Sequence, residues 1–198
     1  MSEKILKPQI RFKGFTDAWE QRKIGECFSE RCESMPEGEL ISVTINEGVK
    51  KFSELNRHDN SNDDKSKYKK VCIGDLPYNS MRMWQGASGY CPYEGIVSPA
   101  YTVLTPNFGI DSKCISYLFK RPDMIHCFQA NSQGITSDNW NLKYNKLSEI
   151  IINISSSLEE QIKISELFSK LDSLITLHQR KCEKLKNMKK ALLDKMFC

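Results

Sequence analysis

The fold is decided by residues 158–197, LEEQIKISELFSKLDSLITLHQRKCEKLKNMKKALLDKMF, which predict one long amphipathic helix. Ser157 followed by Glu160 fits a capping box, so the helix is expected to begin at Leu158. Within it, seam residues recur three and four positions apart, the a/d pattern of a coiled coil. These seam residues are Ile164, Leu167, Leu171, Leu174, His178, Lys181, Leu185, Met188, Leu192 and Lys195.

This seam predicts an interface with another helix. At 1.5 Å per residue the helix is about 60 Å long, whereas a domain of ~150 residues is roughly 30 Å across. Part of the seam therefore needs a partner helix, although a long helix folded onto its own domain is the alternative. The polar residues His178 and Lys181 interrupt the seam near its middle and are expected to define the pairing geometry.

The rest of the chain predicts a mixed α/β (α+β) domain over residues 1–156, with the long helix occupying 157–198. An N-terminal arm, residues 1–19, is expected to lie over a surface, with its aromatic residues as anchors. Between Asp111 and Gln129, apolar residues at helical spacing around Pro122 predict a kinked helix or two short ones. Residues 56–70 are polar and predict a surface loop. Strands are expected at Leu40–Ile45, Val71–Ile73, Ala100–Leu104 and Ile150–Ile154.

Charge and cysteine content exclude several functional classes. A formal net charge of +4 over 198 residues does not identify a polyanionic partner, although basic residues cluster between Arg180 and Lys195. The N-terminus lacks the apolar segment of a signal peptide and no run is long enough to span a bilayer, so we expect a cytoplasmic protein without membrane association. There the eight cysteines are expected to be reduced. Without a C-x-x-C pair, and with three histidines, the chain predicts no metal site and no cofactor.

Two motifs suggest catalysis but lack the residues that it needs. Asp75-Leu76-Pro77-Tyr78 resembles the (D/N)PP(Y/F) loop of amino-methyltransferases, but the glycine-rich turn that binds their cofactor is missing. The acidic pair Asp63 and Asp64, with lysines following, is the nearest approach to a nuclease site. It lies in the polar loop, where a solvated charge run is expected. The sequence therefore predicts a binding protein and not an enzyme.

Two segments have the chemistry of nucleic-acid readers. Residues 78–90, YNSMRMWQGASGY, offer amide and guanidinium groups that pair with adenine and guanine edges in the major groove. Residues 130–141, ANSQGITSDNWN, offer further donors and acceptors around Gly134. The alternative for each is an ordinary polar loop with its Trp in the core. The predicted base contacts are Asn79, Arg82, Trp84, Gln85, Gln133, Ser137 and Asn139, and the predicted phosphate contacts are Lys50, Lys51 and Lys143.

Five strings taken in order, PQIRFKGFTDAWEQRKIGE at 8–26, GDLPYNSMRMWQG at 74–86, GIVSPAYTVL at 95–104, GITSDNW at 134–140 and LEEQIKISELFSKLDSLI at 158–175, resemble the specificity subunit of type I restriction–modification enzymes. Such subunits typically carry two target-recognition domains, each followed by a long helix, and the helices pair antiparallel as a spacer between the halves of a split DNA site. This chain has one copy of each and therefore resembles a half-length subunit, either naturally so or as a fragment of a longer one. The resemblance makes Asp75–Tyr78 part of the recognition fold.

The resemblance implies double-stranded DNA as a partner and assigns methylation and cleavage to separate modification and restriction subunits. Pairing through the helix would occur with a second copy or with another specificity half. In that case the chain reads one half of a bipartite target. The alternative is an assembly or regulatory half-subunit, which binds a full-length specificity or modification subunit without reading DNA itself.

Overall fold

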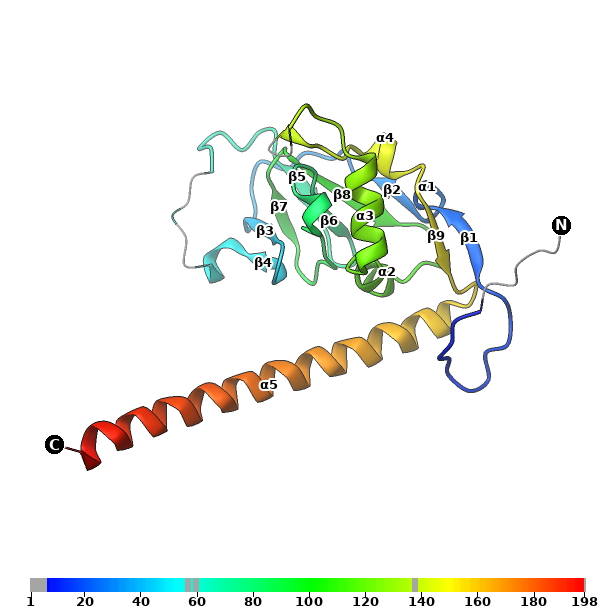
Figure 1. The fold of residues 1–198 in the computed structure, drawn as a ribbon. Helices are drawn as coiled ribbons and strands as arrows, with labels where there is room; N and C mark the ends of the chain where they lie inside the picture. The colour runs from blue at the N-terminus through cyan, green and yellow to red at the C-terminus, as the bar shows by residue number, and fades with distance from the viewer. Residues whose placement is uncertain (1–6, 56–57, 59–60, 137–138, 198) are drawn as a thin grey trace.

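The computed structural model describes residues 7–55, 58, 61–136 and 139–197, and consists of an α/β domain from which one long helix extends (Figure 1). The fold is thus of the predicted class. The elements in chain order, with η marking single 3-10 turns, are β1 (Glu20–Lys23), α1 (Ile24–Cys27), β2 (Phe28–Glu30), β3 (Ile41–Thr44), β4 (Gly48–Lys51), η1 (Phe52–Glu54), β5 (Lys69–Val71), β6 (Leu76–Asn79), η2 (Met83–Gln85), β7 (Gly95–Val97), β8 (Tyr101–Pro106), α2 (Ser112–Leu118), α3 (Pro122–Asn131), α4 (Tyr144–Leu147), β9 (Ile151–Ile154) and α5 (Leu158–Met196).

The strands form small antiparallel sheets. A three-stranded sheet has the order β2-β8-β6, and β3-β4, β5-β7 and β1-β9 form pairs. The β1-β9 pair joins the first and the last strand of the domain in chain order, with Glu20 opposite Ile154 and Lys23 opposite Ile151. Since β9 leads into α5 and the arm leads into β1, this pairing brings the arm to the start of the long helix.

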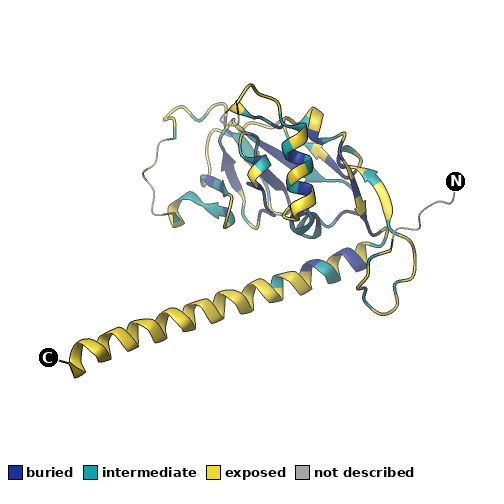
Figure 2. Cartoon of the chain, in the orientation of Figure 1, coloured by how far each residue is buried: buried dark blue, intermediate teal, exposed yellow. Residues whose placement is uncertain are grey.

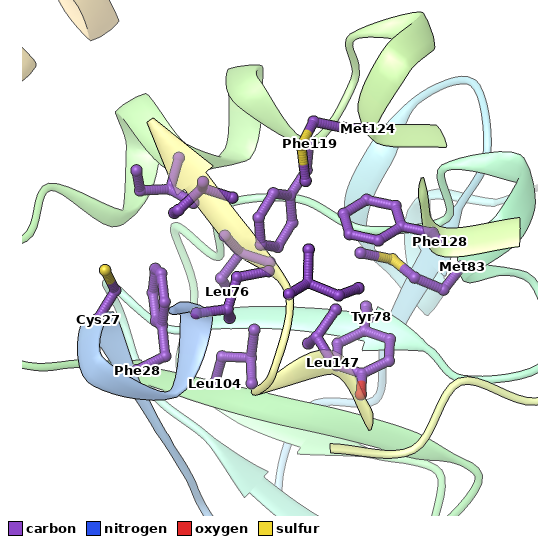
Figure 3. Close-up of a cluster of buried hydrophobic side chains, with 14 of the residues drawn as sticks. Cys27, Phe28, Leu76, Tyr78, Met83, Leu104, Phe119, Met124, Phe128 and Leu147 are labelled. Carbon is purple, nitrogen blue, oxygen red and sulfur yellow. The ribbon is translucent and has the colours of Figure 1, made fainter. Parts of the chain in front are cut away.

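The main hydrophobic core lies between the three-stranded sheet and the helices α2, α3 and α4 (Figure 3). Tyr78, Phe28 and Leu104 come from the sheet and are fully buried. Phe119 and Phe128 meet them from the helical side, with ring centroids 5.1 Å apart in an edge-on arrangement that aromatic quadrupoles favour. A second cluster, which includes Ile41, Val49 and Val97, covers the β3-β4 side.

Most sequence predictions of the elements agree with the structure. Residues 111–129 form two helices, with Pro122 at the first turn of α3, where its missing N–H costs nothing. The strand predicted at Val71–Ile73 instead spans Lys69–Val71. It ends early because the Asp75 carboxylate accepts the Cys72 N–H at 2.8 Å, and Gly74 turns the chain at φ +94°. In the polar 56–70 segment, residues 56–57 and 59–60 lie outside the described residues.

The long helix begins at Leu158 as predicted, but its cap differs from a capping box. Ser157 Oγ accepts the Glu160 N–H at 3.3 Å. The Glu160 side chain does not return to the cap, because Arg11 of the arm donates Nε and Nη2 to its two carboxylate oxygens at 2.6 and 2.9 Å. The Ser157 N–H donates instead to Ser155 Oγ, at 3.1 Å.

Only the first turns of α5 pack on the domain (Figure 2). Gln161 is buried and donates to the carbonyls of Ser155 and Gly109, at 2.9 and 3.2 Å, while its Oε1 accepts the Asp111 N–H. Farther along, the Tyr117 hydroxyl of α2 donates to Asp172 at 2.7 Å. From residue 170 to residue 197 every side chain is exposed, so the alternative of a helix folded along its own domain holds only for its first turns.

Two general features complete the fold. Among the described helices, none combines the length and the apolar composition that crossing a membrane requires. Within the same part of the chain, no group of three or more His, Cys, Asp or Glu side chains is placed to hold a metal ion.

Candidate nucleic-acid interface

The first predicted reading segment is a compact loop that leaves β6 and returns to it. The Arg82 N–H donates to Asn79 O and the Asn79 N–H to Ala87 O, each at 2.9 Å. Between them lies the 3-10 turn η2, whose Met83 is fully buried in the main core. Gly86 ends this turn at φ +81°, a left-handed conformation that other residues rarely adopt. The loop is therefore fixed at its base, and its side chains are presented from a defined backbone.

The predicted base contacts of this loop divide into two kinds. Asn79 Oδ1 accepts the Met81 N–H at 3.0 Å, so part of its amide stabilises the turn. Arg82 is half-buried and Gln85 exposed, and no described residue forms a side-chain hydrogen bond or ion pair with either. These two side chains are available to a ligand.

The second reading segment is a short hairpin. Gln133 and Asn141 exchange backbone hydrogen bonds of 3.0 and 2.8 Å. Gly134 is required beside them, because a Cβ there would lie 2.6 Å from the Asn139 carbonyl oxygen. Gln133 and Asn139 are exposed, and Asn139 Nδ2 donates to Thr136 Oγ1 at 3.4 Å. The predicted contact Ser137 lies outside the described residues.

The two segments, whose facing ends are forty residues apart in sequence, are joined by their tryptophans. The rings of Trp84 and Trp140 meet edge to face, with centroids 5.3 Å apart and an interplanar angle of 78°. The Trp84 indole N–H donates to Met81 O at 3.1 Å, and the Leu142 N–H donates to Ser80 O at 2.9 Å. Trp84, which we predicted to contact bases, packs one reading segment against the other in the structure.

The predicted phosphate contacts lie in two places. Lys50 and Lys51 are on β4. Lys50 is 3.9 Å from the Glu47 carboxylate, and the Lys51 ammonium lies 5.4 Å from the centre of the Tyr93 ring. Lys143 follows the second hairpin, is exposed, and has no ion pair among the described residues. Only Lys143 is therefore close in sequence to a reading segment and uncommitted.

Lys120, which the sequence did not predict, stabilises the first reading loop through hydrogen bonds to backbone carbonyls. Its ammonium group donates to the Gly86 carbonyl at 2.6 Å and to the Ile45 carbonyl at 3.5 Å, which joins the loop to the β3-β4 turn. Lys120 as a whole residue is exposed, but desolvation of its ammonium group lowers its pKa. No sequence signal marks Lys120, because both of its partners are backbone carbonyls distant in the chain.

The string Asp75–Tyr78 belongs to the fold. Asp75 is buried and accepts Nε and Nη2 of Arg31 at 2.9 and 3.0 Å. Tyr78 is fully buried, its hydroxyl donates to Leu142 O at 3.0 Å, and burial raises its pKa. Neither side chain is free to stack on a base or to polarise one.

The predicted helix interface is fully described. Ile164 is half-buried beside the domain, whereas Leu167 and Leu171 are 45% and 44% exposed. Farther from the domain, the seam residues Leu174, His178, Lys181, Leu185, Met188 and Leu192 are all exposed. From Leu171 onward the structure thus presents an apolar stripe with a polar centre, which no described residue of the chain covers.

Comparison with known proteins agrees with this architecture. The type I restriction modification DNA specificity domain family matches residues 16–187. The HsdS subunit from Thermoanaerobacter tengcongensis has a similar fold, with a TM-score of 0.53 and 15% identity over 93% of this chain and 46% of that one. The type I restriction-modification S subunit from M. genitalium gives a TM-score of 0.51 and 16% identity over 91% and 46%.

A third structure, of a chain from a type I R-M system, gives a TM-score of 0.56 and 14% identity over 92% of this chain and 47% of that one. This chain therefore spans about half the length of the three structures it resembles. No curated protein sequence matches it significantly.

Proposed function

Because this chain belongs to the type I restriction modification DNA specificity domain family, we propose that it reads one half of a bipartite DNA target. It pairs through α5 with a second specificity half and recruits modification and restriction subunits, which supply methylation and cleavage. In this proposal the recognition domain, residues 1–156, reads DNA. The helix, residues 157–198, provides the pairing. Support for that boundary comes from Ser157, which caps the helix directly after the domain.

One observation carries the proposal: the Trp84–Trp140 contact brings two segments rich in amide and guanidinium groups together. Arg82, Gln85 and Gln133 have no partner side chain among the described residues, as base-reading groups require. Arg pairs bidentately with guanine and Gln with adenine, so such a surface suits major-groove recognition.

The target sequence is identified first, by methylome sequencing of cells that express the chain with its modification subunit. On that target, Arg82→Ala should weaken cognate binding by about 1–3 kcal/mol and leave nonspecific binding nearly unchanged. Lys143→Ala serves as the contrasting variant, because loss of a phosphate contact weakens both DNAs alike and reduces the salt slope by about 1. If Arg82→Ala weakens binding to cognate and to nonspecific DNA equally, Arg82 contacts the phosphate backbone and not a base.

The alternative function, assembly without DNA reading, is supported by the exposed seam alone. DNA binding by the complex of this chain with the modification subunit distinguishes the two functions. If this chain neutralises DNA phosphates, the DNA affinity of the complex should fall by orders of magnitude between about 50 and 200 mM salt. A complex whose DNA binding is the same with and without this chain would favour the assembly function. If two copies pair about a two-fold axis, the methylated target is an inverted repeat.

A further inference from the structure

The turn that joins β3 to β4 lies beside the first reading loop, although the two are distant in the sequence. The ammonium group of Lys120 donates to the Ile45 carbonyl of the turn at 3.5 Å and to the Gly86 carbonyl of the loop at 2.6 Å. Farther along the same reading segment, Gly89 passes the start of β4, since a Cβ at Gly89 would lie 3.5 Å from the Gly48 Cα. The turn and the first reading segment are therefore held together at two places.

This β3-β4 turn consists of residues 45–47, and the residues on either side of it fix its shape. Thr44 Oγ1 accepts the Glu47 N–H at 3.0 Å and donates to the Gly48 carbonyl at 3.2 Å. Gly48 supplies the left-handed conformation, at φ +68°. Asparagine is common in turns because its side chain bonds to nearby backbone or because it tolerates that conformation. Neither reason applies to Asn46, since Thr44 and Gly48 perform these tasks.

The Asn46 side chain is available to a ligand. It is exposed, and no described residue forms a hydrogen bond with it. Its amide therefore keeps both a donor and an acceptor free. That pair matches the major-groove edge of adenine, where N6 donates and N7 accepts, and asparagine can bind both groups at once. The turn thus carries the same chemistry as the two reading segments.

The strand that leaves the turn carries two of the predicted phosphate contacts, Lys50 and Lys51. The Lys50 ammonium lies 3.9 Å from the Glu47 carboxylate, and the two side chains are 39% and 61% exposed. An exposed ion pair of this length contributes little, so Lys50 can exchange Glu47 for a phosphate. Phosphate contacts fix the register in which base contacts form, so basic residues next to a base-reading group are an arrangement suited to DNA.

We propose that the β3-β4 turn is a third reading segment, in which the Asn46 amide pairs with the N6 and N7 groups of an adenine in the major groove. This inference rests on the proposed function, and it adds to that function a base-reading residue and the base that the residue selects. The sequence did not mark the turn, because neither a tryptophan nor a second amide side chain accompanies Asn46 between residues 41 and 51.

The test uses the cognate sequence that methylome sequencing identifies, and measures DNA binding by the complex of this chain with its modification subunit. Asn46→Ala should weaken cognate binding by about 5- to 140-fold and leave nonspecific binding nearly unchanged, because a bidentate base contact discriminates by roughly 1–3 kcal/mol and each 1.4 kcal/mol is tenfold. The matched control is Asn153→Ala, at another exposed asparagine. It lies on β9, across the domain from β3 and β4 (Figure 1), and should bind both DNAs like the wild type.

A second measurement identifies the base atom that Asn46 contacts. One adenine of the target at a time is replaced by 7-deazaadenine, which lacks the N7 acceptor. The wild type should bind one of these duplexes about two- to tenfold more weakly, the cost of one hydrogen bond. Asn46→Ala should show no loss at that position and keep its sensitivity at every other one. A merely structural role of Asn46 would lower affinity without removing the sensitivity at a single adenine.

Failure of the inference and failure of the proposed function give different results. A wild-type complex that binds cognate and random duplexes equally would overturn both. If the wild type discriminates but Asn46→Ala binds the cognate duplex as tightly, the turn does not read DNA. Equal losses on both duplexes would make Asn46 a phosphate contact. Sensitivity to 7-deazaadenine that Asn46→Ala leaves intact at every position would refute the adenine contact.

Discussion

Leu174→Ala is expected to weaken self-association of this chain by about thirtyfold. Leu174 lies on the seam and is 51% exposed, so about half of its surface remains to be covered by a partner helix. Full burial of a leucine is worth about 1.5–3 kcal/mol, so the remaining half contributes about 1 kcal/mol. The substitution occurs in both copies, and the resulting ~2 kcal/mol corresponds to about thirtyfold, because each 1.4 kcal/mol is tenfold.

The measurement is sedimentation equilibrium of the full-length chain, with Leu177→Ala as the control. Leu177 lies three residues farther along the same helix, is 61% exposed and is not on the seam. Both substitutions replace leucine by alanine, which keeps helix propensity high, so circular dichroism should show equal helix content. Equal weakening by both variants, or by neither, would refute the assignment of the seam.

Three further predictions concern the domain and the start of α5. Burial raises the pKa of Glu160, but hydrogen bonds from Arg11 and Ser155 more than offset this, so its pKa lies below the ordinary 4.5. The stabilisation by its charged form is therefore complete above pH 4.5 and is lost as the pH falls through the lowered pKa. In urea unfolding, the stability difference between the wild type and Glu160→Gln should shrink from pH 7 to pH 3, and a constant difference would contradict this. A thiol reagent at pH 8 should modify the exposed Cys32 and Cys182 before Cys91 and Cys114, since burial raises the pKa of Cys91 to about 11 and of Cys114 to about 12. Early labelling of Cys91 in the native protein would show that the core opens. Tyr78→Phe should cost about 1–2 kcal/mol of unfolding free energy, because the buried Leu142 carbonyl loses its hydrogen-bond donor.

The sequence predicted the elements whose signals are local. The three-and-four spacing of apolar residues located α5, and Ser157 located its first residue. Pro122 divided residues 111–129 into two helices because a proline is tolerated in the first turn but not within a helix. The candidate reading segments were also found locally, from amide and guanidinium groups beside glycine and tryptophan.

Errors arose where a distant side chain altered a local rule. The reciprocal half of the capping box is missing because Arg11, 149 residues earlier in the chain, binds the Glu160 carboxylate. Lys120 escaped prediction since it stabilises the first reading loop through the carbonyls of Gly86 and Ile45, and backbone groups leave no mark in a sequence. Which predicted contacts meet bases stays a prediction.

By itself, then, the sequence determined the helix, its apolar seam and the chemistry of two polar segments, because periodicity and residue type act over a few residues. Only the tertiary structure decided that Trp84 meets Trp140, that the arm reaches the start of α5, and that the seam is left uncovered. Such contacts depend on the path of the chain between distant segments, here on the pairing of β1 with β9 and of β6 with β8. Strand pairing is selected by the burial of the whole core, and no short stretch of sequence specifies it.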